Sequence, residues 1–295
     1  MVYINTEGKF NENTYLIDAE LYRLKNSLAI YVIENNGMRV MVDSPSELGV
    51  RKFIKKLKQY DLYPIHKILL THSHFDHVQG VEKLKRLMPE FNPEILASEK
   101  AIDNLKNPDK MNKVFGYNVP IIENVTPLKE GDIVDINGLK LEVLNFFGHT
   151  QDCIAFLDVK NKNIFVGDAI IDRFDLDTPL PEFAPPDFNE SELLKTFEKL
   201  RNLKSKINSL SLPHFGVFKD EHFEETLDMM ESFHFETKNS IIKWYNENPS
   251  LKYITLKYHE KFTPNSKIHT KDNIHGLELL IEWQITQLKM SGDII

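Results

Sequence analysis

The sequence predicts an α/β fold followed by a helical C-terminal region, and two observations carry that prediction. Up to about residue 219, short apolar and β-branched runs alternate with segments whose apolar residues recur at helical spacing. From residue 220 onward, only the helical spacing remains. We therefore expect one α/β domain over residues 1–219 and a helical subdomain over residues 220–295.

The composition is that of a globular protein, with 41% hydrophobic and 27% charged residues in a chain of 295. No stretch approaches the ~20 consecutive apolar residues of a membrane helix, and the first residues lack the pattern of a secretory signal. The single cysteine, Cys153, excludes an internal disulfide framework. These features favour a cytoplasmic protein without a membrane partner. The net charge of −8 repels a phosphate backbone and argues against a nucleic-acid partner.

The first strands are predicted around a hairpin. Two β-rich runs, residues 27–34 and 38–43, are joined by Asn35-Asn36-Gly37, which is typical of a tight turn. Residues 67–70 are an uninterrupted apolar run, as expected for a strand that is buried on both faces. The other elements expected here are helices over 50–60 and 79–88 and a strand over 95–98.

A second strand-rich region follows, and Asn137-Gly138 marks a hairpin within it. Residues 178–186 are rich in proline and show neither a helical nor a strand period, so we expect a loop there. The strands expected in this part of the chain are 133–136, 139–146, 154–159, 163–166 and 207–212. The helices expected are 189–203, 221–246, 249–260 and 272–289.

The strongest chemical signal comes directly after the apolar run at 67–70. His72, His74, Asp76 and His77 fall within six residues there. His72 and His74 are two residues apart, so in extended backbone their side chains point the same way. Converging imidazoles and carboxylates are the ligands of protein metal sites. An isolated histidine would be interpreted as structural, but this cluster predicts a metal site.

Three more ligand-type residues follow the ends of predicted strands. Each of them alone would be interpreted as a cap or a turn residue. Together with the first cluster they make a set at four strand ends, which chance explains poorly. The candidate metal ligands are His72, His74, Asp76, His77, His149, Asp168 and His214.

In these motifs, His-x-His-x-Asp-His at 72–77 and then His149, Asp168 and His214, the chain resembles the metallo-β-lactamase superfamily. The resemblance spans about residues 10–220 and includes an early Asp43 after the second hairpin strand. It implies a four-layer αββα sandwich with the site along one edge. It also implies one metal ion on His72, His74 and His149, a second on Asp76, His77 and His214, and Asp168 as the bridge between them.

The aspartate at position 168 indicates which branches of the family the chain resembles. Antibiotic-hydrolysing members often carry cysteine at this position, whereas aspartate is similar to the glyoxalase II, lactonase and phosphodiesterase branches. The long helical C-terminal region also resembles that of glyoxalase II. The chain departs from the commonest pattern after His149, because Gln151-Asp152-Cys153 stands where Pro-Gly-Ser is frequent. Cys153 is interpreted as a small buried residue.

The predicted activity is hydrolysis by a hydroxide that two divalent metal ions share. Zn²⁺ is the expected ion, and Fe or Mn are alternatives that histidine and aspartate ligands leave open. Asp76 and Asp168 are the expected catalytic residues, the first orienting the nucleophile and the second holding both ions. The expected partner is a small-molecule ester, thioester or lactone. A phosphodiesterase or ribonuclease with the same site is the alternative, and a non-enzymatic scaffold ranks last because all candidate ligands are present.

The helices after residue 220 are expected to wall the site, because a site at a sandwich edge is open on one side. His214 ends the last predicted strand, so we expect the first of these helices to begin close to the second metal. One or two of its aromatic residues would then line an apolar pocket: Phe223, Phe233, Phe235, Trp244 and Tyr245. Candidates for the general acid are Tyr117 and the loop 173–186. The histidines interpreted as surface or structural residues are His66, His222, His234, His259, His269 and His275.

Overall fold

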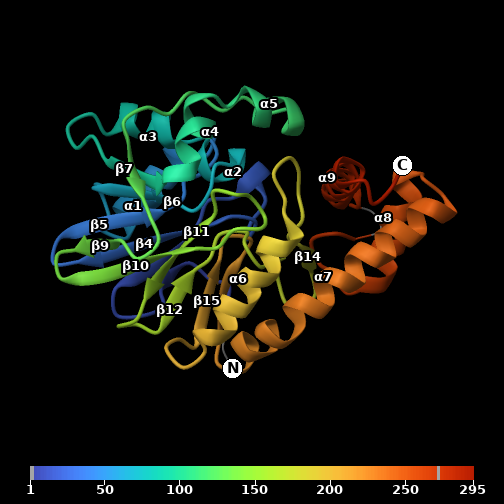
Figure 1. Ribbon diagram of the computed structural model, residues 1–295. Coiled ribbons are helices and arrows are strands. Elements are labelled where there is room, and N and C mark those ends of the chain that lie inside the picture. The colour runs from blue at the N-terminus through green and yellow to red at the C-terminus, as the bar shows by residue number, and fades with distance from the viewer. Residues whose placement is uncertain (1–2, 271–272) are drawn as a thin grey trace.

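The computed structural model describes residues 3–270 and 273–295 (Figure 1). Most of the described strands belong to two seven-stranded sheets. The first sheet contains, in spatial order, β2 (Gly8–Lys9), β3 (Thr14–Asp18), β4 (Ala29–Asn35), β5 (Met38–Val42), β6 (Lys67–Leu70), β7 (Glu94–Ser98) and β8 (Val125–Leu128). The second contains β1 (Tyr3–Ile4), β16 (Gly216–Lys219), β15 (Ser209–Leu212), β12 (Asn163–Phe165), β11 (Ile154–Asp158), β10 (Leu139–Asn145) and β9 (Ile133–Ile136).

The two sheets pack face to face, as the alternation along β4 shows. Ile30 and Val32 point to the outer face, where they join the core beneath the helices of the first sheet. Tyr31 and Ile33 point inward and join a second core with residues of the other sheet, such as Phe156. Because successive side chains of a strand alternate between faces, one strand can contribute to both cores.

Helices cover the outer face of each sheet. The first sheet is covered by α1 (Val50–Gln59) and α3 (Val81–Leu87), whose Phe53 and Leu84 are buried against its strands. The second sheet is covered by α6 (Glu190–Asn202) and by the first half of α7 (Glu221–Glu247), through residues such as Phe197 and Leu227. This order of layers confirms the predicted αββα sandwich.

The C-terminal helices lie to one side of the sandwich, coloured orange to red in Figure 1. Here the second half of α7 packs with α8 (Leu251–Phe262) and α9 (His275–Ser291) around a core that includes Trp244, Tyr258 and Ile281. Leu180 and Phe183 of the proline-rich segment belong to the same core. The helices of residues 3–270 and 273–295 include none with the length and apolar character that a bilayer span requires. The domain division at residue 219 stays a prediction.

The proline-rich segment is not the loop without strands that the sequence predicts. Its residues Pro179–Pro181 form β14, which pairs antiparallel with β13 (Ile171–Arg173) in a separate two-stranded sheet. Proline is tolerated there because a strand with a single neighbour needs its N–H groups on one side only. The same reasoning explains Pro127 in β8, an edge strand that the sequence did not predict.

Two helical predictions also change. The helix expected over 79–88 is α3, and a separate short helix, α2 (Phe75–Val78), precedes it. Two further helices between β7 and β8 were not expected: α4 (Ile102–Lys106) and α5 (Asp109–Phe115). The last predicted helix begins at His275, and position 272 lies outside the described residues.

The expectation that α7 begins close to His214 is wrong, because β16 intervenes. This strand pairs antiparallel with β15, with Leu212 opposite Gly216 and Ser209 opposite Lys219. It therefore carries the chain back to the opposite end of β15 before α7 starts at Glu221. A four-residue strand with one polar end carried too little periodicity to be predicted.

Candidate metal centre

The structure brings all seven candidate ligands to one edge of the sandwich. His72 and His74 follow the end of β6, while Asp76 and His77 lie on the short helix α2. The other three come from the second sheet, after β10, after β12 and between β15 and β16: His149, Asp168 and His214. They form two groups, His72 with His74 and His149, and Asp76 with His77, Asp168 and His214, and within each the ligand atoms lie within 4.8 Å of one another.

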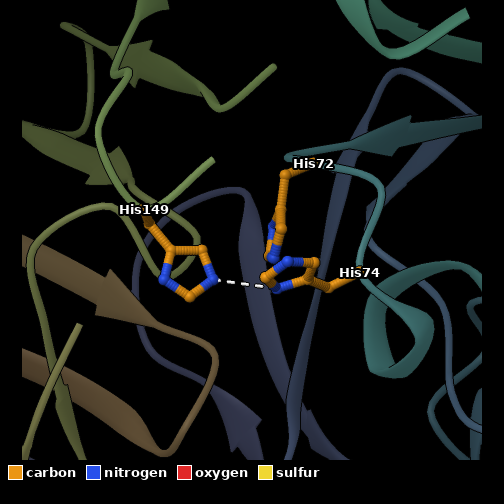
Figure 2. A group of neighbouring side chains, drawn as sticks. All are labelled: His72, His74 and His149. Carbon is orange, nitrogen blue, oxygen red and sulfur yellow. Dashed lines mark hydrogen bonds between the residues drawn. The ribbon is translucent and has the colours of Figure 1, made fainter. Parts of the chain in front are cut away.

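The first group consists of three buried imidazoles. Figure 2 shows His72 and His74 on the loop after β6, with His149 facing them from the second sheet. His149 Nε2 lies 2.9 Å from His74 Nδ1. The ring centroids of His72 and His149 are 5.1 Å apart and nearly perpendicular. Three convergent imidazoles of this kind are a common donor set for a first-row metal ion.

The second group contains two carboxylates, and one of them reaches both groups. Asp76 Oδ2 lies 3.4 Å from His214 Nε2. Asp168 Oδ2 lies 3.3 Å from His77 Nε2, and it is also close to the Nε2 atoms of His214 at 3.7 Å, His149 at 3.8 Å and His72 at 3.9 Å. A single carboxylate oxygen therefore stands between imidazoles that belong to different groups.

Hydrogen bonds fix which ring nitrogen of four histidines faces the centre. His149 Nδ1 donates to the carbonyl oxygen of Glu182, and His214 Nδ1 donates to the carbonyl oxygen of Ser27 at 2.7 Å. His77 Nδ1 lies 2.9 Å from Oδ2 of Asp43, and His72 Nδ1 lies 3.1 Å from the hydroxyl of Thr71. Because these partners hold each Nδ1, Nε2 is the ring nitrogen that faces the centre, as in metal-binding histidines.

Asp43 is the hub of this arrangement. Its carboxylate accepts hydrogen bonds from the Thr71 backbone N–H at 2.7 Å and from the Thr71 hydroxyl, as well as from His77 Nδ1. It is buried, with 2% of its surface exposed. Asp43 thus orients His77 directly and His72 through the Thr71 hydroxyl. The sequence marked the residue only as part of a resemblance, because its partners lie about thirty positions away.

Two glycines allow the ligand loops to approach. Gly167 precedes Asp168 and has φ +56°, and a Cβ at this position would lie 2.7 Å from Thr71 Oγ1. Gly148 precedes His149 and has φ +137°, and a Cβ there would lie 2.5 Å from the Cα of Leu193 on α6. Both positions need the left-handed backbone and the close contact that only glycine provides.

The electrostatics of the centre favour a bound cation. Burial lowers the pKa values of His72 and His74 well below the usual range, so both rings are neutral. Burial would raise the pKa of Asp168, but the nearby His77 and His214 hold it well below its usual range. Burial likewise lowers the pKa of His77, yet Asp168, Asp43 and Asp76 raise it well above 6.5. The negative charge of the carboxylates in this group therefore favours a positive charge beside them, such as that of a metal ion.

Unpartnered atoms test whether a metal fits. In the part of the chain that the structure describes, the buried atoms without a hydrogen-bond partner include Nε2 of His72, Nε2 of His77 and Oδ1 of Asp168. Leaving such atoms buried and unpaired is costly, unless a ligand satisfies them. Neutral imidazoles and ionised carboxylates are the donors that divalent first-row metals bind. The residues therefore fit metal ions at this site.

A cavity of about 390 Å³ opens onto the centre. The candidate ligands among its lining residues are His74, Asp76, His149, Asp168 and His214. Apolar lining residues come from α9 and from the segment before β4, among them Leu21, Leu24, Leu279, Leu280 and Trp283. Tyr117 also lines the cavity, and its hydroxyl donates to that of Tyr22 at 2.6 Å. The volume is in the range of small-molecule sites.

A C-terminal helix lines the cavity, as expected from the sequence, but it is not the helix that the sequence predicted. None of the aromatic residues predicted on the first C-terminal helix is among the lining residues. Phe223 packs instead in the core of the second sheet, and Trp244 packs among the C-terminal helices. Among the C-terminal helices, α9 supplies lining residues instead, and it lies further along the chain. Of the histidines interpreted as surface or structural, His269 and His275 line the cavity.

Residues 27–211 match the family model of the metallo-beta-lactamase superfamily. A protein of Streptococcus pyogenes named as a probable metallo-hydrolase is 29% identical over 178 residues, which cover 56% of this chain and 74% of that protein. A hydroxyacylglutathione hydrolase of Aliivibrio salmonicida is 30% identical over 145 residues, or 49% of this chain and 48% of that one. The chain thus spans about half the length of the hydroxyacylglutathione hydrolase it matches.

Solved structures agree on the fold. A metallo-beta-lactamase superfamily protein from the archaeon Sulfolobus tokodaii superposes with a TM-score of 0.63 at 18% identity, covering 94% of this chain and 98% of its own. A metallo-beta-lactamase family protein from Thermus thermophilus gives 0.61 at 16% identity, with 95% and 94% covered. The match over residues 27–211 extends over more than half of the chain and includes six of the seven candidate ligands. The chain therefore belongs to the metallo-beta-lactamase superfamily, as the motifs predicted.

Proposed function

We propose that the chain is a metal-dependent hydrolase with a dinuclear centre that Asp168 bridges. The observation that carries the proposal is the place of Asp168 Oδ2, between 3.3 and 3.9 Å from Nε2 atoms of histidines in both groups. His72, His74 and His149 would hold one ion, and Asp76, His77 and His214 the other. The matched relatives are named as hydrolases, which supports the reaction class.

Bound there, two divalent ions would activate water as a nucleophile near neutral pH and stabilise negative charge on the substrate. Asp76 lies on the cavity side of the second group and would accept a hydrogen bond from the attacking water. Zn²⁺ is the expected ion, and the donor set also suits Fe or Mn. A solved structure of this fold is described in a di-iron-bound form, so iron belongs in the test.

The cavity supports a small carbonyl substrate with an apolar part. Leu279, Leu280 and Trp283 of α9 line the same cavity as the metal centre. A substrate whose ester, thioester or lactone carbonyl lies at the centre would place its remaining atoms against these side chains. The name hydroxyacylglutathione hydrolase describes a thioester substrate for the matched relatives, which favours acyl transfer to water over attack on phosphorus. A cytoplasmic location stays the expectation from composition.

The test combines metal analysis with a hydrolysis screen. Protein purified without chelator should contain more than one equivalent of metal. Its hydrolysis of small esters, thioesters or lactones should vanish with a chelator and return with Zn²⁺, Fe²⁺ or Mn²⁺. A value of one equivalent that persists after reconstitution would contradict the dinuclear centre. Activity on phosphodiesters or RNA alone would replace the proposed substrate class by the alternative one.

A further inference from the structure

A series of charged groups, of which Glu182 and His234 are buried, connects the C-terminal helices to the candidate ligand His149. The series begins at Glu182, just after β14, whose carbonyl oxygen accepts the hydrogen bond from His149 Nδ1. The carboxylate of Glu182 is itself buried, with 1% of the residue exposed, and accepts a hydrogen bond from His234 Nδ1 on α7. Glu182 therefore contacts the metal centre with its backbone and α7 with its side chain.

His234 is held from both sides. Its Nε2 lies 2.9 Å from Glu190 Oε1 at the start of α6. Lys238, one turn further along α7, donates to the same oxygen at 3.0 Å and pairs with Asp293 at 3.3 Å. Since a carboxylate only accepts, both ring nitrogens of His234 donate, and the ring is an imidazolium. Burial lowers the pKa of His234, but Glu182 and Glu190 more than offset this and raise it above 6.5.

The surroundings of His234 make this an unusual place for charge. The ring is fully buried and lies within about 6 Å of the rings of Phe183, Phe188 and Phe235. A buried charge in aromatic surroundings is costly unless it is paired, and its removal leaves its partner unpaired. Without His234, Glu182 would be a buried carboxylate that lacks its donor. The side chain would then favour a position nearer to solvent, and the backbone at 182 would shift with it.

We propose that His234 is a positioning residue: it holds Glu182 so that the carbonyl oxygen at 182 fixes the ring of His149. The affinity of the first group for its metal ion would then depend on a residue of the C-terminal helices. Hydrogen-bond partners of metal-binding histidines typically contribute about 10-fold to 100-fold to metal affinity. The inference extends the proposed metal site, but its tests do not require hydrolysis.

Two substitutions separate the two bonds of His234. In His234→Asn the amide nitrogen takes the place of Nδ1 and keeps the donor toward Glu182. In His234→Gln it takes the place of Nε2 and keeps only the donor toward Glu190. The matched control is His259→Gln, because His259 is also buried in the helical region but pairs with Thr263 instead.

The first readout is metal affinity, measured by competition with a chromophoric chelator for Zn²⁺. We expect His234→Gln to weaken one of the two bound ions about tenfold, while His234→Asn and His259→Gln stay near wild type. Wild-type affinity for both ions in folded His234→Gln would overturn the proposal. An equal loss in His259→Gln would do the same, because it would reveal a general packing effect.

The second readout uses the metal-free protein. The His149 Nδ1 proton, protected by the carbonyl of Glu182, should give a slowly exchanging signal in ¹H–¹⁵N spectra. The signal should persist in His234→Asn and His259→Gln and broaden or shift in His234→Gln. Its persistence unchanged in His234→Gln would overturn the proposal. If His234→Gln fails to fold, Glu182→Met replaces it, because its side chain has a similar length and cannot accept the bond from His234; the same losses are expected, and wild-type affinity would overturn the proposal. Inactivity of the wild type would count against the proposed function alone.

Discussion

The two walls of the cavity are built on opposite principles. On the metal side, side chains from four strand ends are buried and oriented, and most of the imidazoles have their Nδ1 proton committed to a named acceptor. On the α9 side, Leu279, Leu280 and Trp283 present apolar surface that carries no such directional bonds. Under the proposed function, the chemistry would depend on fixed orientation, whereas substrate recognition would depend on shape and apolar contact.

Asp168→Ala should have the largest effect. Removing the oxygen that stands between both groups should lower kcat by about 10³-fold or more and reduce bound metal, because the second group loses a carboxylate. Metal content and kcat measured on the same preparation check this. Asp177→Ala, an exposed aspartate of the loop that follows, is the control and should match wild type. Full activity in Asp168→Ala would remove the bridging role.

Acid should destabilise the helical wall through His269. Its Nε2 is buried without a partner among the described residues, and burial together with His259 lowers its pKa from 6.5 to about 4. Between pH 6.5 and about pH 4, His269 is protonated in the unfolded chain but neutral in the folded chain. The free energy of unfolding therefore falls as the pH is lowered through this range. The loss amounts to about 3 kcal/mol. Urea unfolding at pH 7 and pH 4.5 should show a smaller loss in His269→Gln, and equal losses would contradict the assignment.

Asp43→Asn should weaken metal binding although it replaces none of the candidate ligands. An amide keeps the size of Asp43 but cannot accept from Thr71 and His77 as the carboxylate does. We expect metal affinity to fall about 10-fold to 100-fold while the protein stays folded. Titration of the metal-free protein with Zn²⁺ gives the affinity. Unchanged affinity would show that orientation is not what the metal side depends on.

Leu279→Ala should affect recognition and leave the metal centre alone. Leu279 is half-buried and lines the cavity, and shortening it removes apolar contact that a substrate would make. We expect KM for the best apolar substrate to rise about tenfold, with kcat and metal content unchanged. Met290→Ala, on an exposed position of the same helix, is the control. A fall in kcat with constant KM would contradict the separation of the two walls.

Cys153→Ser should have the smallest effect. Cys153 is buried next to Thr150, with its sulfur 3.0 Å from the hydroxyl, and it belongs to neither ligand group. Serine keeps a similar size and can bond the same hydroxyl, so activity and metal content should stay within about twofold of wild type. Loss of metal in this variant would show that the set of ligands is incomplete.

The metal side could be predicted from the sequence because its signals are local. His72, His74, Asp76 and His77 stand together in the chain, and each remaining candidate ligand follows a strand that its apolar pattern predicts. The sandwich and the positions of most central strands followed in the same way.

The sequence predicts that the C-terminal helices wall the cavity, but it does not indicate which of them does so, because the contacts of the wall connect distant residues. The periodicity of α9 indicates an apolar face but does not indicate what that face meets. Because the short strand β16 carries no clear period, the sequence predicts the start of α7 too close to His214 and therefore predicts the wrong helix at the cavity. Glu182 and His234 were equally hidden, since a lone glutamate in a proline-rich segment and a lone histidine on a helix carry no pattern that relates them.

The position of α9 along the chain also sets an order of assembly. Every candidate ligand, from His72 to His214, precedes the helix that closes the cavity. During synthesis the sandwich can therefore collect its ligands while the recognition wall is still unmade, because N-terminal units generally fold first. In that interval the centre would be open to solvent and to any chelating molecule. Selectivity for substrate would be acquired late, in a separate step from the capacity to hold metal.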